Sequence, residues 1–191
     1  MRYLAVLLTL AWSCLSVAQP ASLQPDLSAV EQWKRVGSAD LDWLFFDVYQ
    51  SNLFTPDGQY RLSHDVSPHP LALTIIYERS ISSSQLVEAT QDQWQKMGFK
   101  SSHFEDWLAQ LKTIFPDVNE GDSLMYVSDG EAGVFKFKRS GSERWISVGK
   151  IDDENFSDAF LSIWLSSKTQ YPKLRRQLIG MNMDMNTNRN N

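Results

Sequence analysis

The segment from residue 156 to residue 180 constrains the fold of this chain more than any other. Its first part carries apolar side chains three and four residues apart, at Phe156, Ala159, Phe160, Ile163 and Trp164. That spacing predicts an amphipathic helix with a wide apolar face. A second helix is predicted to begin at Pro172 and to end at Gly180, because proline suits the first turn of a helix and glycine the position after its last turn. Such a pair of helices must pack on a flat apolar surface.

Apolar runs and alternating patterns upstream predict strands that provide this surface. They cover residues 39–49 with a continuation to 54, a short return strand at 60–62, and 71–79, 123–128, 132–138 and 145–151. A helix is predicted from Ser82, which forms a capping box with Gln85, to a stop at Gly98, and another over 102–114 before Pro116. The apolar line of the first of these helices is predicted at Leu86, Ala89, Trp94 and Met97.

The order of these elements indicates the fold class. Strands and helices come in blocks joined by hairpin-like turns, without the regular strand–helix alternation of a parallel sheet. The chain is therefore expected to form an α+β fold, in which an antiparallel β-sheet has helices packed on one face.

The N-terminus has the pattern of a secretory signal peptide over residues 1–18. Arg2 supplies the positive charge, residues 4–10 are apolar, and small residues at 16–18 suit cleavage before Gln19. The apolar run is shorter than the roughly 20 residues that span a bilayer, and Trp12 is too bulky for a lipidation signal at Cys14. A periplasmic or secreted protein is expected, with a linker and short helix at 19–35, one domain at 36–181 and a disordered polar tail at 182–191.

Charge and composition narrow the classes of partner. Cleavage removes Arg2, the one charged residue of the first 18, and so takes the formal net charge from −5 to −6. No basic cluster stands out, so nucleic acid is not an expected partner. No glycine-rich phosphate loop appears, and His64 and His69 share a proline-rich loop without a third metal ligand, so neither cofactor nor metal is expected.

Several motifs, taken in order along the chain, resemble those of the bacterial chalcone isomerase-like family. They are Val36–Ala39 leading to 45–54, Pro70–Arg79, Gly121-Asp122, Asp129-Gly130, 148–151, Ile163-Trp164-Leu165 and the segment from Pro172 to Gly180. The resemblance implies an open-faced sandwich with an apolar cleft between sheet and helices. In plant chalcone isomerases this cleft holds a flavonoid precursor for ring closure, and in non-catalytic relatives it holds a fatty acid.

Both kinds of relative use a buried arginine, and the resemblance places its position at Leu41. Arg35 lies six residues earlier, nearly 20 Å along a strand at about 3.3 Å per residue. The plant enzymes' tyrosine and lysine are also not evident around Ser84, Gln85 and Glu88. Isomerase catalysis is therefore not expected, and no catalytic residue is assigned.

Four polar residues on the apolar strands are the candidate ligand-binding residues: Tyr49, Thr74, Tyr77 and Arg79. Buried polar groups need partners, and either a ligand's polar head or backbone and water would satisfy them. The leading hypothesis is an exported, non-catalytic protein that binds a small apolar or acyl ligand such as a fatty acid. The alternatives are a structural or protein-interaction module with a filled core, and an enzyme of unknown reaction.

Overall fold

The computed structural model describes residues 27–43, 46–68, 70–100 and 104–181. The strands in this part are β1 (Lys34–Trp43), β2 (Phe46–Thr55), β3 (Leu71–Tyr77), β4 (Ser123–Ser128), β5 (Gly133–Lys138) and β6 (Ile146–Ile151). The helices are the 3-10 helix η1 (Leu27–Gln32) and the α-helices α1 (Ser83–Lys96), α2 (Phe104–Ile114), α3 (Glu154–Leu165) and α4 (Pro172–Leu178). No helix in these ranges has the length and apolarity needed to cross a membrane. The predicted signal peptide and tail lie outside them.

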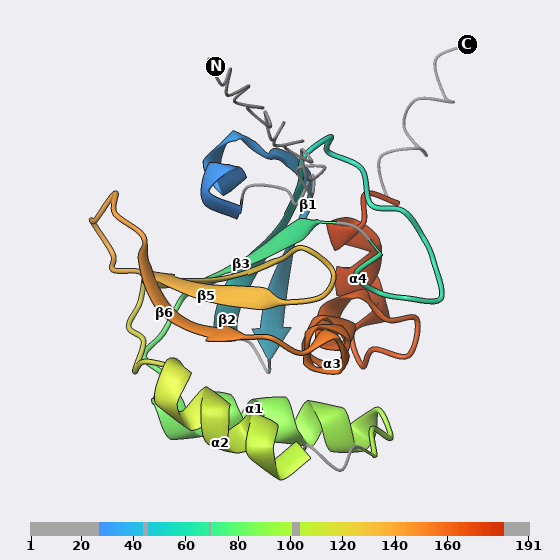
Figure 1. Cartoon of the computed structure of the whole chain (residues 1–191). Coiled ribbons are helices and arrows are strands. Elements are labelled where there is room, and N and C mark those ends of the chain that lie inside the picture. The colour runs from blue at the N-terminus through green and yellow to red at the C-terminus, as the bar shows by residue number, and fades with distance from the viewer. Residues whose placement is uncertain (1–26, 44–45, 69, 101–103, 182–191) are drawn as a thin grey trace, which may run out of the picture.

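The six strands form one sheet in sequence order, and each strand is antiparallel to its neighbours (Figure 1). The pair α1 and α2 is inserted between β3 and β4, and α3 and α4 follow β6. Alternate residues of β3, including Leu73 and Ile75, join the helices in the main core. Ala72 points to the other face, where it packs with Val30 from η1 in a small second cluster. The predicted α+β class is confirmed.

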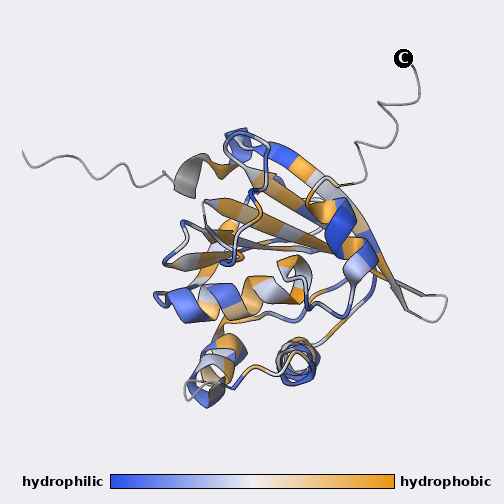
Figure 2. Cartoon of the chain, turned by 90° about the vertical axis from the view of Figure 1, so that its right-hand side faces the viewer, coloured by the Kyte–Doolittle hydropathy of each residue, from blue (hydrophilic) through white to orange (hydrophobic). Residues whose placement is uncertain are grey.

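The main core lies where the apolar faces of the sheet and helices meet. Figure 2 shows hydrophobic residues along the strands and hydrophilic residues on the outer sides of the helices. The stripe predicted for α3 is confirmed, because all five of its members are buried. Phe156 and Phe160 stack with ring centroids 5.8 Å apart, and Trp94 of α1 contacts Phe156 edge-on at 6.1 Å. Aromatic packing therefore joins α1 to α3.

The predicted helix ends also agree with the structure. Ser82 and Gln85 form the capping box of α1, with Gln85 N–H donating to Ser82 Oγ at 3.3 Å and Ser82 N–H donating to Gln85 Oε1 at 2.9 Å. Pro172 lies in the first turn of α4, and Gly180 follows the helix with a φ of 77°. Left-handed backbone of this kind favours glycine.

The apolar line predicted for α1 was wrong in part. Its buried residues are Val87, Thr90 and Trp94, whereas Leu86 is half-buried and Ala89 is exposed. Both of these residues lie beside a cavity.

Two predictions about the N-terminal strands were wrong. The apolar run at 39–49 is not one strand, because β1 ends at Trp43 and β2 begins at Phe46, and these two residues pair in the antiparallel register. No return strand forms at 60–62, since β2 already pairs with β1 on one side and with β3 on the other. Instead, Arg61 pairs with Asp57 in an exposed loop.

The contact between β1 and α4 depends on Gly37. A Cβ atom at this position would lie 2.1 Å from the carbonyl oxygen of Gln177 and 2.5 Å from that of Leu178. Because both are backbone atoms, no side-chain rotation relieves the overlap. We expect Gly37→Ala to lower the free energy of unfolding by about 3 kcal/mol, as overpacked sites do. Chemical denaturation measures this loss.

Gly141→Ala is the matched control for that experiment. Its Cβ would meet nothing within 4 Å, and its φ of 75° is the only source of strain. We expect a loss of about 1 kcal/mol. Equal losses at the two glycines would contradict a tight β1–α4 contact.

Candidate functional site

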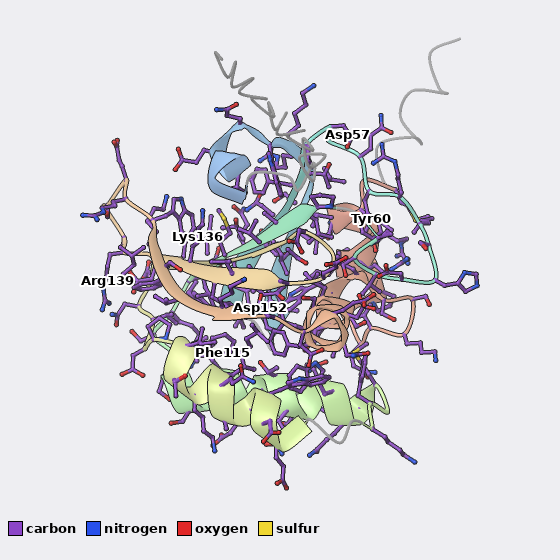
Figure 3. The ribbon with its side chains drawn as sticks, in the orientation of Figure 1. Asp57, Tyr60, Phe115, Lys136, Arg139 and Asp152 are labelled. Carbon is purple, nitrogen blue, oxygen red and sulfur yellow. The ribbon has the colours of Figure 1, made fainter. Side chains whose placement is uncertain are left out.

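A cavity of about 540 Å³ lies between the sheet and the helices α1 and α3. This volume is within the range of about 300–1,000 Å³ that is usual for small-molecule sites. Figure 3 shows Phe115, one of the lining residues, between the sheet and the helices α1 and α2. The apolar lining residues are Leu41, Val48, Ile75, Ile81, Leu86, Ala89, Phe115, Leu124, Phe160, Ile163 and Trp164.

Tyr49 supplies the first polar group of the cavity. It lies opposite Leu41 of β1 and opposite Tyr77 of β3 in the sheet register, so the three side chains share one row. The indole Nε1–H of Trp164 donates to the Tyr49 hydroxyl oxygen at 2.8 Å. Burial raises the pKa of Tyr49, the Trp164 hydrogen bond lowers it, and the nearby phenols of Tyr171 and Tyr77 raise it further. The Tyr49 phenol therefore stays protonated at neutral pH.

Other uncharged polar residues also line this space: Tyr77, Tyr171, Gln93, Thr90, Gln85 and Ser80. Burial raises the pKa of both tyrosines. The Gln93 amide Nε2–H donates to the Tyr171 hydroxyl at 3.1 Å. Gln93 Oε1 is buried without a hydrogen-bond partner in the described part of the chain. Phenol and amide groups therefore gather inside an otherwise apolar cavity.

Charged side chains line the cavity only where they are exposed. Arg79 follows β3, and Asp92 and Lys96 lie on α1. All three residues are exposed to solvent. They mark the mouth of the cavity, and its interior walls are built from uncharged residues.

Of the four residues predicted to bind a ligand, the structure brings together three. Tyr49, Tyr77 and Arg79 line the cavity, and Thr74 does not. Thr74 pairs with Asn52 and Met125 and belongs to the alternate row of β3 that faces the second cluster. Residues 74 and 77 differ by an odd number, so a strand places them on opposite faces. This alternation of side chains along β3 therefore places Thr74 on the face of the sheet that points away from the cavity.

Sequence reasoning did not assign Trp164, Gln93 and Tyr171 to the site. Trp164 was predicted as part of the apolar stripe of α3 and of a family motif, and not as a ligand-binding residue. Gln93 carried no signal. The departure from the predicted apolar line of α1 is informative here, because Leu86 and Ala89 both line the cavity, and Leu86 also packs against the edge of the core.

Outside the cavity, Asp158 on α3 is a half-buried carboxyl next to the loop that precedes β3. Ser67 Oγ donates to Asp158 Oδ1 at 2.6 Å, and Ser67 N–H donates to Asp65 Oδ1 at 2.7 Å. Burial raises the pKa of Asp158 to about 6, the Ser67 hydrogen bond lowers it, and the adjacent Asp65 carboxyl raises it. Within the described residues, no group of three or more His, Cys, Asp or Glu side chains is arranged to hold a metal.

This raised pKa makes stability depend on pH. The folded protein binds the Asp158 proton more tightly than the unfolded chain, so the stability that this carboxyl contributes is lost as the pH rises from about 4 to about 6. We expect Asp158→Asn to match the wild type near pH 4 and to be more stable by about 1 kcal/mol at pH 8, a value reduced for solvent screening.

Denaturation at the two pH values measures this difference. Glu88→Gln, which removes an exposed carboxyl on α1, is the control and is expected to show no such change. A wild type that is more stable than Asp158→Asn at pH 8 would contradict a raised pKa.

Comparisons with known proteins place this chain in a family. The family model described as chalcone isomerase-like matches residues 42–180. A protein of Haemophilus influenzae, described as uncharacterized, is 27% identical over 148 residues, which are 78% of this chain and 68% of that protein. The crystal structure of a fatty-acid-binding protein of Arabidopsis thaliana superposes with a TM-score of 0.58 at 9% identity, over 79% of this chain and 88% of that one. The family predicted from the motifs is confirmed: the chain belongs to the chalcone isomerase-like family.

Proposed function

We propose that this protein is a non-catalytic binding protein for a small apolar or acyl ligand, which it holds between the sheet and the helices α1 and α3. The observation that carries the proposal is the cavity of about 540 Å³, with apolar walls and a few convergent polar groups. That combination is typical of ligand sites. The structural neighbour from Arabidopsis thaliana, a fatty-acid-binding protein, supports the same class of ligand.

The nature of the interior polar groups favours binding over catalysis. Tyr49 and Tyr77 have raised pKa values, so neither phenol is a ready general base near neutral pH. Leu41, at the position where the family resemblance places an arginine, lines the cavity beside them. An interaction module with a filled core would leave no space of this size.

Native mass spectrometry of the purified protein, with organic extraction of whatever accompanies it, tests the proposal. We expect a co-purifying small apolar or acyl compound at one per chain, or a mass shift when acyl chains are added. A mass that stays that of the free chain with a panel of acyl compounds and flavonoids would contradict it.

We also propose that the protein acts in the periplasm or is secreted. The proposal rests on the signal-peptide pattern of residues 1–18. Fractionation of the source cells, followed by intact-mass measurement, is expected to find a chain that begins at Gln19 outside the cytoplasm. A full-length chain that stays in the cytoplasmic fraction would overturn this part and leave the binding proposal unaffected.

A further inference from the structure

The polar interior of the cavity offers hydrogen-bond donors without a neighbouring cation. The cationic side chains that line it, Arg79 and Lys96, are exposed at its mouth. Inside, Leu41 occupies the row of Tyr49 and Tyr77. A ligand head that reaches the inner wall therefore meets phenols, an amide and apolar side chains.

The hydrogen bonds already made inside the cavity determine which donors and acceptors remain free to bind a ligand. The Tyr49 oxygen accepts from Trp164, and the Tyr171 oxygen accepts from Gln93, so neither bond uses the hydroxyl hydrogen of the tyrosine. The Tyr77 hydroxyl has no hydrogen-bond partner among the described residues. Gln93 Oε1 also lacks a partner there, but it has almost no accessible surface, so a ligand in the cavity does not reach it. The inner wall can therefore donate hydrogen bonds to an oxygen atom of a ligand.

An ionised carboxylate suits this wall poorly. Removing a negative charge from water is costly unless a cation compensates it, and the cationic side chains that line the cavity, Arg79 and Lys96, are exposed. A neutral hydroxyl group avoids this cost, because its oxygen accepts hydrogen bonds from the tyrosines and carries no charge.

We propose that the cavity takes an apolar ligand whose buried head is a neutral hydroxyl group, held by Tyr49 and Tyr77 as hydrogen-bond donors. The inference rests on the proposed function and adds the chemical class of the ligand. A carboxylic acid enters this site only in its protonated form.

Calorimetric titration with decanol and decanoic acid at pH 6 and pH 8 tests this inference. The charged or titratable side chains that line the cavity are Tyr49 on β2, Tyr77 on β3, Arg79 after β3, Asp92 and Lys96 on α1, and Tyr171 before α4. None is a histidine, the residue whose charge ordinarily changes in this interval. We therefore expect the affinity for decanol to be the same at both pH values, and decanol also controls for any effect of pH on the protein.

Decanoic acid is expected to behave differently. A free carboxyl group loses its proton near pH 4, so a site that binds only the neutral acid loses about tenfold in affinity per pH unit above that value. From pH 6 to pH 8 the affinity for decanoic acid should fall about 100-fold. An affinity for decanoic acid that exceeds that for decanol at pH 8, and that Arg79→Ala removes, would overturn the inference and place an anion at the mouth.

Tyr77→Phe tests the head group directly, since removing this hydroxyl breaks no hydrogen bond within the described part of the free protein. We expect it to weaken decanol binding by about fivefold to tenfold, the effect of one lost hydrogen bond. Tyr60→Phe is the matched control, because the Tyr60 hydroxyl donates to the carbonyl oxygen of Val66 outside the cavity. Unchanged decanol binding by Tyr77→Phe would overturn the assignment. Failure of both compounds to bind the wild type would instead refute the proposed function.

Discussion

Replacing Ala89 with tryptophan is expected to weaken ligand binding by at least about 100-fold while the protein stays folded. Ala89 lies on the face of α1 that lines the cavity, and its own side chain is exposed. The indole ring has an apolar space beside it, and entering that space removes the ring from water. The ligand then loses the volume that it would occupy. The expected loss corresponds to about 2.7 kcal/mol of binding free energy.

Ala109→Trp provides the matched control for this variant. Ala109 is exposed on α2 and does not line the cavity. The free energy of unfolding of both variants is expected to lie within about 0.5 kcal/mol of the wild-type value, as is usual for surface substitutions. Titration with decanol should then show wild-type affinity for Ala109→Trp only. Equal affinities for both variants would mean that the ligand binds elsewhere.

Replacing Trp94 with alanine is expected to have the largest effect on stability, a loss of about 4 kcal/mol. Trp94 is fully buried, and its indole Nε1–H donates to the carbonyl oxygen of Ala159 at 2.8 Å. Its ring also contacts Trp107 edge-on, with centroids 5.6 Å apart. The variant removes the aromatic side chain that joins α1 to α3, and these helices form one wall of the cavity. Because the free energy of unfolding of a typical domain is about 5–15 kcal/mol, the variant loses a large part of its stability.

The control for this variant is Trp145→Ala. Trp145 is half-buried in the small cluster on the other face of the sheet, where Lys138 lies over its ring at 5.1 Å. We expect a loss of about 1 kcal/mol, since less apolar surface is exposed. Denaturant titration followed by circular dichroism measures both values. A similar loss at the two tryptophans would contradict the central place of Trp94 in the core.

The elements that the sequence predicted well are those with local signals. The α3 helix has a wide apolar stripe, Ser82 and Gln85 cap α1 within four residues of chain, and Gly180 ends the last helix. The strand predicted at 123–128 matches β4 because turn residues flank it on both sides. Local signals failed at 43–46, where the chain reverses between two apolar strands without glycine, proline or asparagine in the run.

The candidate site was only partly predictable, because its contacts are not local. Tyr49 and Trp164 form a hydrogen bond although 115 residues separate them. Gln93 lines the cavity because α1 faces β2 and β3 across this space, and nothing in the sequence around Gln93 indicates this. The search for polar residues on apolar strands identified Tyr49 and Tyr77, which line the cavity, and also Thr74, which does not. The residue type alone does not indicate which face of a sheet a side chain occupies.

The most direct test of ligand binding in the cavity is the nitrogen-15 NMR spectrum of the tryptophan indole groups during titration with decanol. The signal of Trp164, assigned with the Trp164→Phe variant, reports on the bond to Tyr49 inside the cavity. Trp145 reports on the other face of the sheet. We expect the Trp164 signal to shift and to saturate at one decanol per chain, with the Trp145 signal unchanged. A spectrum in which Trp164 stays fixed while Trp145 shifts, or in which neither moves, would contradict binding in this cavity.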